Sequence, residues 1–414
     1  MNTEDRRTVL FTSAAHGLVH TYELAIPILM TVWLAEFSTT AAALGLVVTV
    51  GYGLFGVGSL PGGALVDRFG SRRLILVCVA GMAGSFLLAS AAPSLGVLAV
   101  AIAAWGIAAS VYHPAGLALL SKSVERPGTA LGYHGIGGNV GIAVGPLVVA
   151  VLLLWFDWRL VAAVLAVPAF AVVAYGLLVR EEIDTGTGRG VEADGGSRDW
   201  GVASVVADTR VLMTIGFVLV LVVVTLNGLY YRAFLTFLPE LLDDALPWLS
   251  DVQLFAPDSP QADQFDPASY LYAMILMVGV FGQYVGGRLA DRFRPERALA
   301  AVVAGLSLLA AAFIPASATL PTFLAVSMLL GVALFTIQPL SQATVASYSA
   351  PEMRGLSYGF SYLSIFGIGA LGAGVAGAVL THGSPAALFG LLAVLAAISA
   401  TVCVTILRVG EPRS

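Results

Sequence analysis

Long apolar runs separated by short polar stretches form the pattern of this chain. A run of about 20 apolar residues is long enough to cross a bilayer as an α-helix, so each run predicts a membrane-spanning helix. The predicted helices of the first half are residues 8–36, 41–64, 73–92, 95–121, 128–153 and 158–180. Those of the second half are 209–241, 268–289, 297–316, 319–348, 354–381 and 384–408. The pattern therefore predicts an all-α integral membrane protein with twelve transmembrane helices.

A polar, glycine-rich stretch separates the two sets of helices. Residues 181–208 combine acidic residues with several glycines, which is the composition of a flexible linker. We therefore expect an N-terminal six-helix half over residues 1–180, a cytoplasmic linker over 181–208 and a C-terminal six-helix half over 209–414.

Composition supports a membrane protein and excludes several other classes. The chain has 414 residues, of which 58% are hydrophobic and 11% are charged. Soluble domains carry about 25% charged residues. The basic residues lie in short loops rather than in one patch, so no nucleic-acid partner is expected. The two cysteines, Cys78 and Cys403, lie inside apolar runs without metal-ligand spacing and are expected to be buried thiols.

The basic residues predict how the chain is oriented. With both termini in the cytoplasm, 18 of the 20 Lys and Arg residues fall on the cytoplasmic side, as the positive-inside rule requires. The exceptions are Arg159 and Arg232. Arg159 belongs to an Asp-Trp-Arg turn between two helices, which we interpret as structural. The sequence thus predicts a multi-pass protein of the cell membrane, embedded in the lipid bilayer and monomeric.

One polar loop occurs twice. Residues 62–73 read GGALVDRFGSRR and residues 286–297 read GGRLADRFRPER, with seven of twelve positions identical. Two copies of one loop, one in each half, indicate a duplicated membrane unit.

This repeated loop resembles the loop between the second and third helices of the major facilitator superfamily. The resemblance implies two six-helix halves around a central cavity and a cytoplasmic gate, in which the aspartate closes onto neighbouring helix ends and the glycine lets helices approach. The implied gate residues are Gly63, Asp67, Arg68, Gly70 and Arg72 in the first copy, and Gly287, Asp291 and Arg292 in the second. Arg294 replaces Gly70 in the second copy, so its turn is expected to differ.

The first helix contains the densest group of polar side chains within an apolar run. His16 and His20 are four residues apart and share a helix face, with Glu23 near that face and Tyr22 beside it. Ionisable groups inside a membrane are costly and usually face a cavity. We therefore expect Glu23 to bind the coupling proton with His20 as a helper, the alternative being that Glu23 pairs with a cation and fixes the helix. A metal site is the less favoured interpretation of the histidine spacing, and no metal is predicted.

Further polar residues lie within other predicted helices. His113 precedes Pro114, which should bend its helix and free a carbonyl; His113 could help proton coupling or be satisfied by that carbonyl. His134 could meet His113. Arg232 could pair with a helix carboxylate such as Glu23, bind an anionic substrate, or be solvated near Glu240. The expected substrate-cavity residues are His16, Tyr22, His134, Asn139, Asn227, Arg232 and Gln338.

A second, narrower resemblance concerns the direction of transport. The first helix with His16 and Pro27, the fourth with Val111-Tyr112-His113-Pro114 and the seventh with Leu235-Thr236-Phe237-Leu238-Pro239 resemble the fosmidomycin-resistance, drug-efflux branch of the superfamily. Gly141-x-x-x-Gly145-Pro146 resembles the fifth-helix motif of the superfamily's exporters. The resemblance implies proton-driven export, although His20 stands where that branch tends to have an acidic residue.

The sequence therefore predicts a secondary active transporter for a small organic molecule, by proton-coupled efflux. Uptake of a small carboxylate or other anion is the first alternative, a transporter-fold membrane sensor is the second, and sodium could replace the proton. No enzyme motif or nucleotide-binding loop is present in the sequence, so neither catalysis nor a cofactor is expected.

Overall fold

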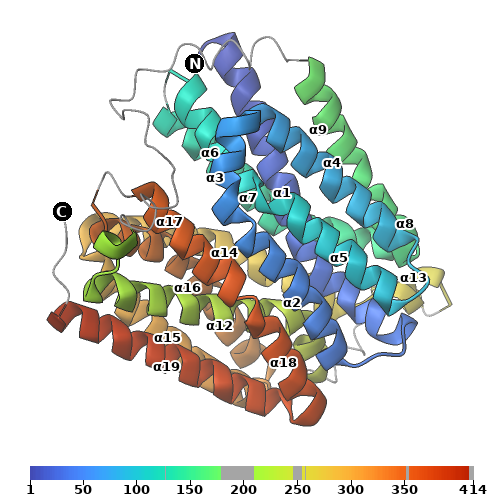
Figure 1. Cartoon of the computed structure of the whole chain (residues 1–414). Coiled ribbons are helices and arrows are strands. Elements are labelled where there is room, and N and C mark those ends of the chain that lie inside the picture. The colour runs from blue at the N-terminus through green and yellow to red at the C-terminus, as the bar shows by residue number, and fades with distance from the viewer. Residues whose placement is uncertain (126, 179–208, 246–253, 257, 351–353, 410–414) are drawn as a thin grey trace. The chain divides into compact units, whose positions relative to one another are not determined.

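The computed structural model describes residues 1–125, 127–178, 209–245, 254–256, 258–350 and 354–409 (Figure 1). Within these ranges the regular structure is helical and no strand occurs. Eleven of the described helices are long and apolar enough to cross a membrane, and Ala41–Val57 is a shorter apolar helix. The predicted all-α membrane class is therefore confirmed.

The chain divides into two compact units. The first contains Met1–Thr39, Val50–Gly196 and Ser250–Ala273, and the second contains Thr40–Thr49, Ser197–Leu249 and Met274–Ser414. The predicted linker, residues 181–208, lies outside the described residues, so the division into halves at that linker stays a prediction. These units differ from the predicted halves because two helices, α2 and α14, contribute residues to both.

The helices that lie wholly or partly in the first unit, apart from the start of α14, are α1 to α9 and the short α13. Their bounds are α1 Thr3–Glu36, α2 Ala41–Val57, α3 Ser59–Phe69, α4 Ser71–Ser90, α5 Leu95–Ser110, α6 Tyr112–Ser123, α7 Pro127–Leu153, α8 Trp158–Val164, α9 Ala166–Leu178 and α13 Pro260–Gln264. Three helices predicted as continuous are interrupted. The run 41–64 breaks at Gly58, between α2 and α3, and the run 95–121 breaks at Val111, between α5 and α6. The run 158–180 breaks at Leu165, between α8 and α9.

Pro114 explains the second interruption. Proline has no backbone N–H, so the carbonyl of Ser110 loses its helical partner. The Ser59 hydroxyl donates to this carbonyl at 3.1 Å. The sequence correctly predicts an interruption before Pro114, and the freed carbonyl accepts from Ser59. Whether this carbonyl also satisfies the His113 ring stays a prediction.

The second unit is also built of helices, and α14 begins in the first unit. The helices are α12 Ile215–Ala245, α14 Pro267–Arg292, α15 Pro295–Ala316, α16 Leu320–Ser347, α17 Arg354–Tyr362, the π-helix η3 Leu363–Ile368, α18 Leu371–His382 and α19 Pro385–Val409. A π-helical turn inside a longer helix is rare and is often found near functional sites. In this chain it interrupts the run predicted as one helix over residues 354–381.

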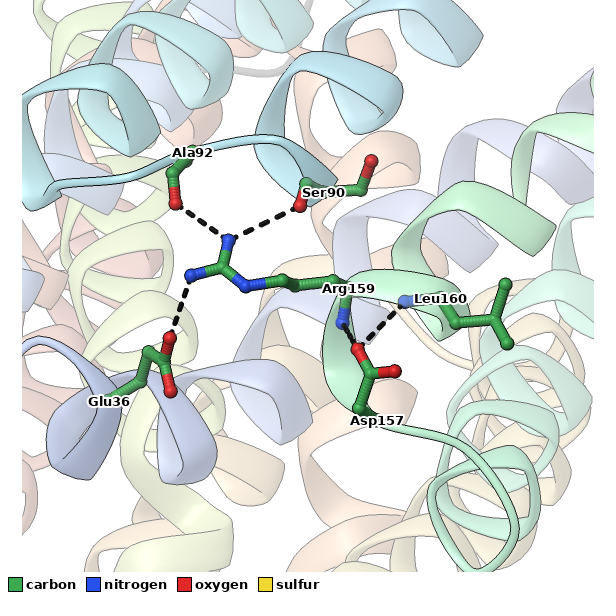
Figure 2. Close-up of polar contacts among 6 residues, drawn as sticks. All are labelled: Glu36, Ser90, Ala92, Asp157, Arg159 and Leu160. Atoms are coloured by element: carbon green, nitrogen blue, oxygen red, sulfur yellow. Dashed lines mark hydrogen bonds and ion pairs between the residues drawn. The ribbon is translucent and has the colours of Figure 1, made fainter.

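The Asp-Trp-Arg turn joins helix ends of the first unit (Figure 2). Asp157 caps α8 by accepting from the backbone N–H groups of Arg159 and Leu160, at 2.9 and 3.2 Å. The Arg159 guanidinium donates to the carbonyls of Ser90 and Ala92, at 3.3 and 2.7 Å, and to Glu36 at 2.7 Å. A cation at the carbonyl end of a helix is favoured by the helix dipole. These contacts agree with the structural interpretation of the turn.

Candidate functional site

Small residues hold α1 and α7 unusually close together in the first unit. A Cβ atom added at Gly141 would lie 2.1 Å from the carbonyl oxygen of Gly17, and one at Gly137 would lie 2.4 Å from that of Ser13. One added at Gly145 would lie 2.8 Å from the Cα of Thr21. Small residues at four-residue spacing let helix backbones approach in a membrane. Gly141 and Gly145 of the exporter-like motif, together with Gly137, thus form the contact that positions the polar groups of α1.

This close packing places His16 against α7. His16 Nδ1 lies 2.8 Å from the backbone carbonyl oxygen of His134, and the two rings stack with centroids 3.9 Å apart. A Cβ atom added at Gly138 would lie 2.5 Å from the His16 ring, so glycine is needed there to admit the imidazole. His134 thus meets His16, whereas the sequence suggested His113 as its neighbour.

His20 and Glu23 continue the group along α1. His20 Nδ1 lies 2.7 Å from Glu23 Oε2, and His20 Nε2 lies 3.1 Å from His16 Nε2. Glu23 is 1% exposed and His20 is 8% exposed. A carboxylate and two imidazoles are therefore in direct contact within a membrane helix, where a polar side chain without a partner would be costly.

His113 on α6 completes a group of three histidines. Its ring lies 5.3 Å from that of His16, edge to face, and 5.8 Å from that of His20. One nitrogen from each of these three residues lies within 4.8 Å of the others, which is close enough for the set to admit a divalent metal ion after small movements. The sequence-based expectation of no metal is not tested by this arrangement and stays a prediction.

Tyr112 belongs to the site but was not among the predicted site residues. Its hydroxyl donates to the backbone carbonyl of Thr12 and also lies 3.2 Å from His134 Nε2. A hydroxyl has one proton to donate, so His134 Nε2 must donate to the tyrosine oxygen. The available signal was its position directly before His113, at the proline bend. We refer below to His16, His20, Glu23, Tyr112, His113 and His134 as the histidine cluster.

Two predicted cavity residues of the first unit lie apart from these contacts. The Tyr22 hydroxyl donates to the Leu165 carbonyl at 2.7 Å, and its ring packs against Phe86. Tyr22 is therefore committed to the packing of α1 on its neighbours rather than to the histidine cluster. Asn139 is half-buried on α7, five residues beyond His134.

Three predicted residues belong to the second unit. The Ser399 hydroxyl donates to the Asn227 side chain at 2.9 Å, and the Gln283 amide donates to Gln338 at 3.1 Å. Arg232 is 1% exposed, and its guanidinium lies 5.5 Å from the ring centroids of Tyr231 and Phe366. Burial contradicts the suggestion that Arg232 is solvated. Pairing with a carboxylate and binding of an anion stay predictions.

The first copy of the repeated loop is divided between surface and interior. The surroundings of Gly63 and the side chain of Asp67 lie outside what the structure describes. Arg68 is exposed over the Phe69 ring, and Gly70 has a φ of 81°, which favours glycine. Arg72 is 6% exposed and donates twice to the Gly176 carbonyl, at 2.9 and 2.7 Å. Arg72 therefore joins α4 to α9 within the first unit.

The second copy keeps the sequence but changes the contacts. Asp291 and Arg292 are exposed. A Cβ atom at Gly287 would meet nothing within 4 Å, whereas one at Gly286 would lie 2.5 Å from Pro339. Close helix approach in this copy is thus made at Gly286, not at Gly287, to which the resemblance assigned it.

The turn of the second copy also differs, as the replacement of glycine predicted. Arg294 has a φ of −58°, and its Nε donates to the buried carboxylate of Glu296 at 2.8 Å. This hydrogen bond and the attraction of Glu296 raise the pKa of Arg294. The contact takes the place of the Arg72 contact of the first copy.

Comparison with known proteins agrees with this fold. The family model described as Major Facilitator Superfamily matches residues 12–369 and 264–414. A bacterial homologue of the human lysosomal transporter Spinster, solved in an inward-facing and unoccupied conformation, has a TM-score of 0.77 at 14% identity, with 99% of this chain and 98% of that chain covered. The nucleoside transporter NupG has a TM-score of 0.76 at 12% identity, with 98% and 100% covered.

Two relatives by sequence are informative. An uncharacterised MFS-type transporter of Mycobacterium tuberculosis (strain H37Rv) is 29% identical over 371 residues, which cover 84% of this chain and 80% of the relative. The puromycin resistance protein pur8 of Streptomyces alboniger is 38% identical over 144 residues, which cover 34% of this chain and only 28% of that protein. The chain therefore belongs to the Major Facilitator Superfamily, and it is a membrane transporter that works by alternating access and not an enzyme.

Proposed function

We propose that this transporter exports a small organic molecule in exchange for protons. The observation that carries the proposal is the contact between Glu23, His20 and His16 inside a membrane helix. Intramembrane carboxylates and imidazoles mark proton relays and substrate paths, because burying them without such a role is costly. The histidine cluster gives this chain a place where a proton can be bound and released.

The export direction is supported by similarity to a resistance protein. The relative pur8 is named for puromycin resistance, and removal of a toxic compound from the cell would provide resistance. The glycine contact of α1 with α7 includes Gly141 and Gly145, the two glycines of the exporter-like motif. Both observations favour efflux over uptake, with a small organic molecule as substrate and the proton as coupling ion.

The proposed orientation places both termini in the cytoplasm of a cell membrane. It follows from the sidedness of the basic residues. In this orientation the two repeated loops are cytoplasmic, and we assign Asp67, Asp291 and the arginines beside them to a gate. Replacing either aspartate should shift the population between the alternating states rather than abolish substrate binding.

Transport by sealed liposomes with an internal pH-sensitive dye tests the coupling. Purified wild type is compared with Glu23→Gln while drugs, phosphonates and small carboxylates are added in turn. We expect one compound class to drive proton movement in wild type and Glu23→Gln to reduce that movement by about 100-fold. Glu36→Gln is the matched control, because Glu36 is the half-exposed acidic residue at the end of the same helix.

Each result has a defined meaning. Proton movement that survives in Glu23→Gln contradicts the assignment of Glu23. Substrate movement that needs sodium and no proton gradient contradicts proton coupling. Selective movement of small carboxylates that is lost in Arg232→Gln would instead favour anion uptake, since buried Arg232 is the cation suited to that role.

A further inference from the structure

The contacts of His16 determine where its protons are. A backbone carbonyl can only accept a hydrogen bond, so His16 Nδ1, at 2.8 Å from the His134 carbonyl oxygen, must carry the proton of that contact. A neutral imidazole has one N–H, and the other nitrogen is then a bare lone pair. In neutral His16 this lone pair is on Nε2, the nitrogen that faces His20.

Counting protons along the chain of contacts shows that one more is needed. Three contacts are linked in series: Glu23 Oε2 to His20 Nδ1, His20 Nε2 to His16 Nε2, and His16 Nδ1 to the His134 carbonyl. Each contact holds one proton if it is a hydrogen bond. Two neutral imidazoles supply two protons, and an ionised carboxylate supplies none. The observed geometry therefore contains a third proton.

We propose that the His16–His20 pair is the element that traps the transported proton, and that this proton holds the two rings together. The proton can reside on His20 beside an ionised Glu23, or on a neutral Glu23 that donates to His20. In both arrangements Glu23, His20 and His16 have no net charge. This proposal rests on the proposed proton coupling and adds to it a positioning role for His16 and for the His134 carbonyl.

Loss of the proton changes the geometry. Without it, neutral His20 has a single N–H, which donates from Nδ1 to the Glu23 carboxylate because a charged oxygen is the stronger acceptor. The lone pairs of His20 Nε2 and His16 Nε2 would then face each other at 3.1 Å. The rings must then separate. His16 is stacked on His134, so the separation acts on the packing of α1 against α7. Protonation is thereby linked to the packing of two helices of the first unit.

The surroundings of this pair contain further titratable groups. His113 and Tyr112 face it from α6, and His134 faces it from α7. Tyr52 of α2 donates to the Glu23 backbone carbonyl, and buried Cys78 of α4 interacts with Tyr112. The tautomer of His134 is fixed by Tyr112, as described above, so this ring has its own donor and acceptor and does not supply the third proton.

His16→Gln provides the sharpest test. Glutamine places an amide N–H near the position of the imidazole Nε2 and can donate to His20 without an added proton. The chain has five histidines, four of them in the histidine cluster, so nitrogen-15 NMR of histidine-labelled protein in nanodiscs can resolve each ring. Infrared spectroscopy of the same samples detects a protonated Glu23. His382→Gln, at an exposed site, is the matched control and identifies its own signal.

In wild type at neutral pH we expect one added proton, seen as an imidazolium at His20 or as a carboxylic acid at Glu23. In His16→Gln we expect neither signal, and in His382→Gln we expect the wild-type pattern. Neutral His16 and His20 beside an ionised Glu23 in wild type would overturn the proposal. So would a chelator that removes bound zinc and changes these histidine signals, because a metal ion would then hold the rings together.

These spectra are recorded without substrate, so their outcome does not depend on transport. If wild type shows the added proton but no substrate moves protons in liposomes, the proposed function fails and the proton-trapping pair stands. If transport is proton-coupled but the added proton is absent, the pair fails and the proposed function stands. If both hold, His16→Gln should carry substrate with proton movement reduced by about tenfold or more.

Discussion

In each unit a glycine of one helix packs on a glycine of another helix, but the side chains at equivalent positions around these contacts differ. In the first, Gly141 packs on Gly17; in the second, Gly369 packs on Gly228. His16 precedes the first of these contacts by one residue, and Asn227 precedes the second.

Two further pairs of equivalent positions can be compared in the same way. His134 lies seven residues before Gly141, and Tyr362 lies seven before Gly369. His113 and Gln338 each precede the proline of their helix. In every pair an imidazole of the first unit is replaced by a side chain that does not titrate near neutral pH. At these positions the groups that titrate near neutral pH therefore belong to the first unit, in agreement with the proposed proton site, whereas the second unit carries the buried cation Arg232.

The largest expected effect comes from separating α1 from α7. Gly141→Leu would place a side chain where even a Cβ atom lies 2.1 Å from the Gly17 carbonyl, so we expect destabilisation by about 3 kcal/mol and loss of proton movement. Gly132→Leu on the same helix is the control, because a Cβ atom there meets nothing within 4 Å. Thermal unfolding and the liposome assay measure both. Equal behaviour of the two variants would contradict the role of this contact.

A second difference between the units concerns the repeated loop. Arg72 lies in the first turn of α4, where the helix dipole disfavours a cation, while Glu296 takes the same place in α15, where an anion is favoured. Two hydrogen bonds from Arg72 to the Gly176 carbonyl offset this unfavourable interaction with the helix dipole.

We expect Arg72→Gln to lower the free energy of unfolding by about 2 kcal/mol, because it removes hydrogen bonds from a charged donor to a buried carbonyl. Thermal unfolding of the purified protein measures this change. Arg73, the exposed neighbour of Arg72, provides the control variant Arg73→Gln, which should unfold as wild type does. If the two arginines are equally tolerant, the buried contact does not stabilise the unit.

The third prediction concerns a substitution in the first unit by the residue that occupies the equivalent position of the second unit. His113→Gln introduces the side chain found at the equivalent Gln338 position. We expect about a tenfold loss of proton-driven transport, equivalent to about 1.4 kcal/mol, with unchanged thermal unfolding. The rate in proteoliposomes with an imposed pH gradient is the measurement, and His382→Gln is the control. A full wild-type rate would exclude His113 from proton handling.

The smallest effect is expected at the helix ends in Figure 2. Glu36→Gln removes an ion pair whose side chains are 39% and 37% exposed, so we expect a loss below about 1 kcal/mol. Arg159→Gln should cost more, because it also removes the hydrogen bonds to the carbonyls of Ser90 and Ala92. Thermal unfolding of the two variants distinguishes them. A larger loss in Glu36→Gln than in Arg159→Gln would contradict this assignment.

The sequence predicted local features well where they depend on neighbouring residues. The apolar runs predicted the membrane helices, and Pro114 predicted a bend, because hydropathy and the missing N–H act within a few residues. It missed the break at Gly58 and the π-helical turn at Leu363–Ile368, which a continuous apolar run does not reveal.

For the candidate site, the sequence predicted most of the residues that belong to it but not the contacts that they make with other helices. His16, His20 and Glu23 were grouped correctly because helical spacing places them on one side of α1. Tyr22 was grouped with them by proximity in sequence, yet its hydroxyl reaches Leu165, 143 residues away. Tyr112 was overlooked because its partners, Thr12 and His134, are on other helices.

By itself the sequence determined that this is an all-helical membrane protein with a duplicated loop. Those properties follow from composition and from distances measured along the chain. Only the tertiary structure decided which histidines meet. His16 contacts a carbonyl 118 residues away, because glycines on α1 and α7 allow the two backbones to approach. That contact fixes the tautomer of His16, and with it the place where the cluster requires an added proton.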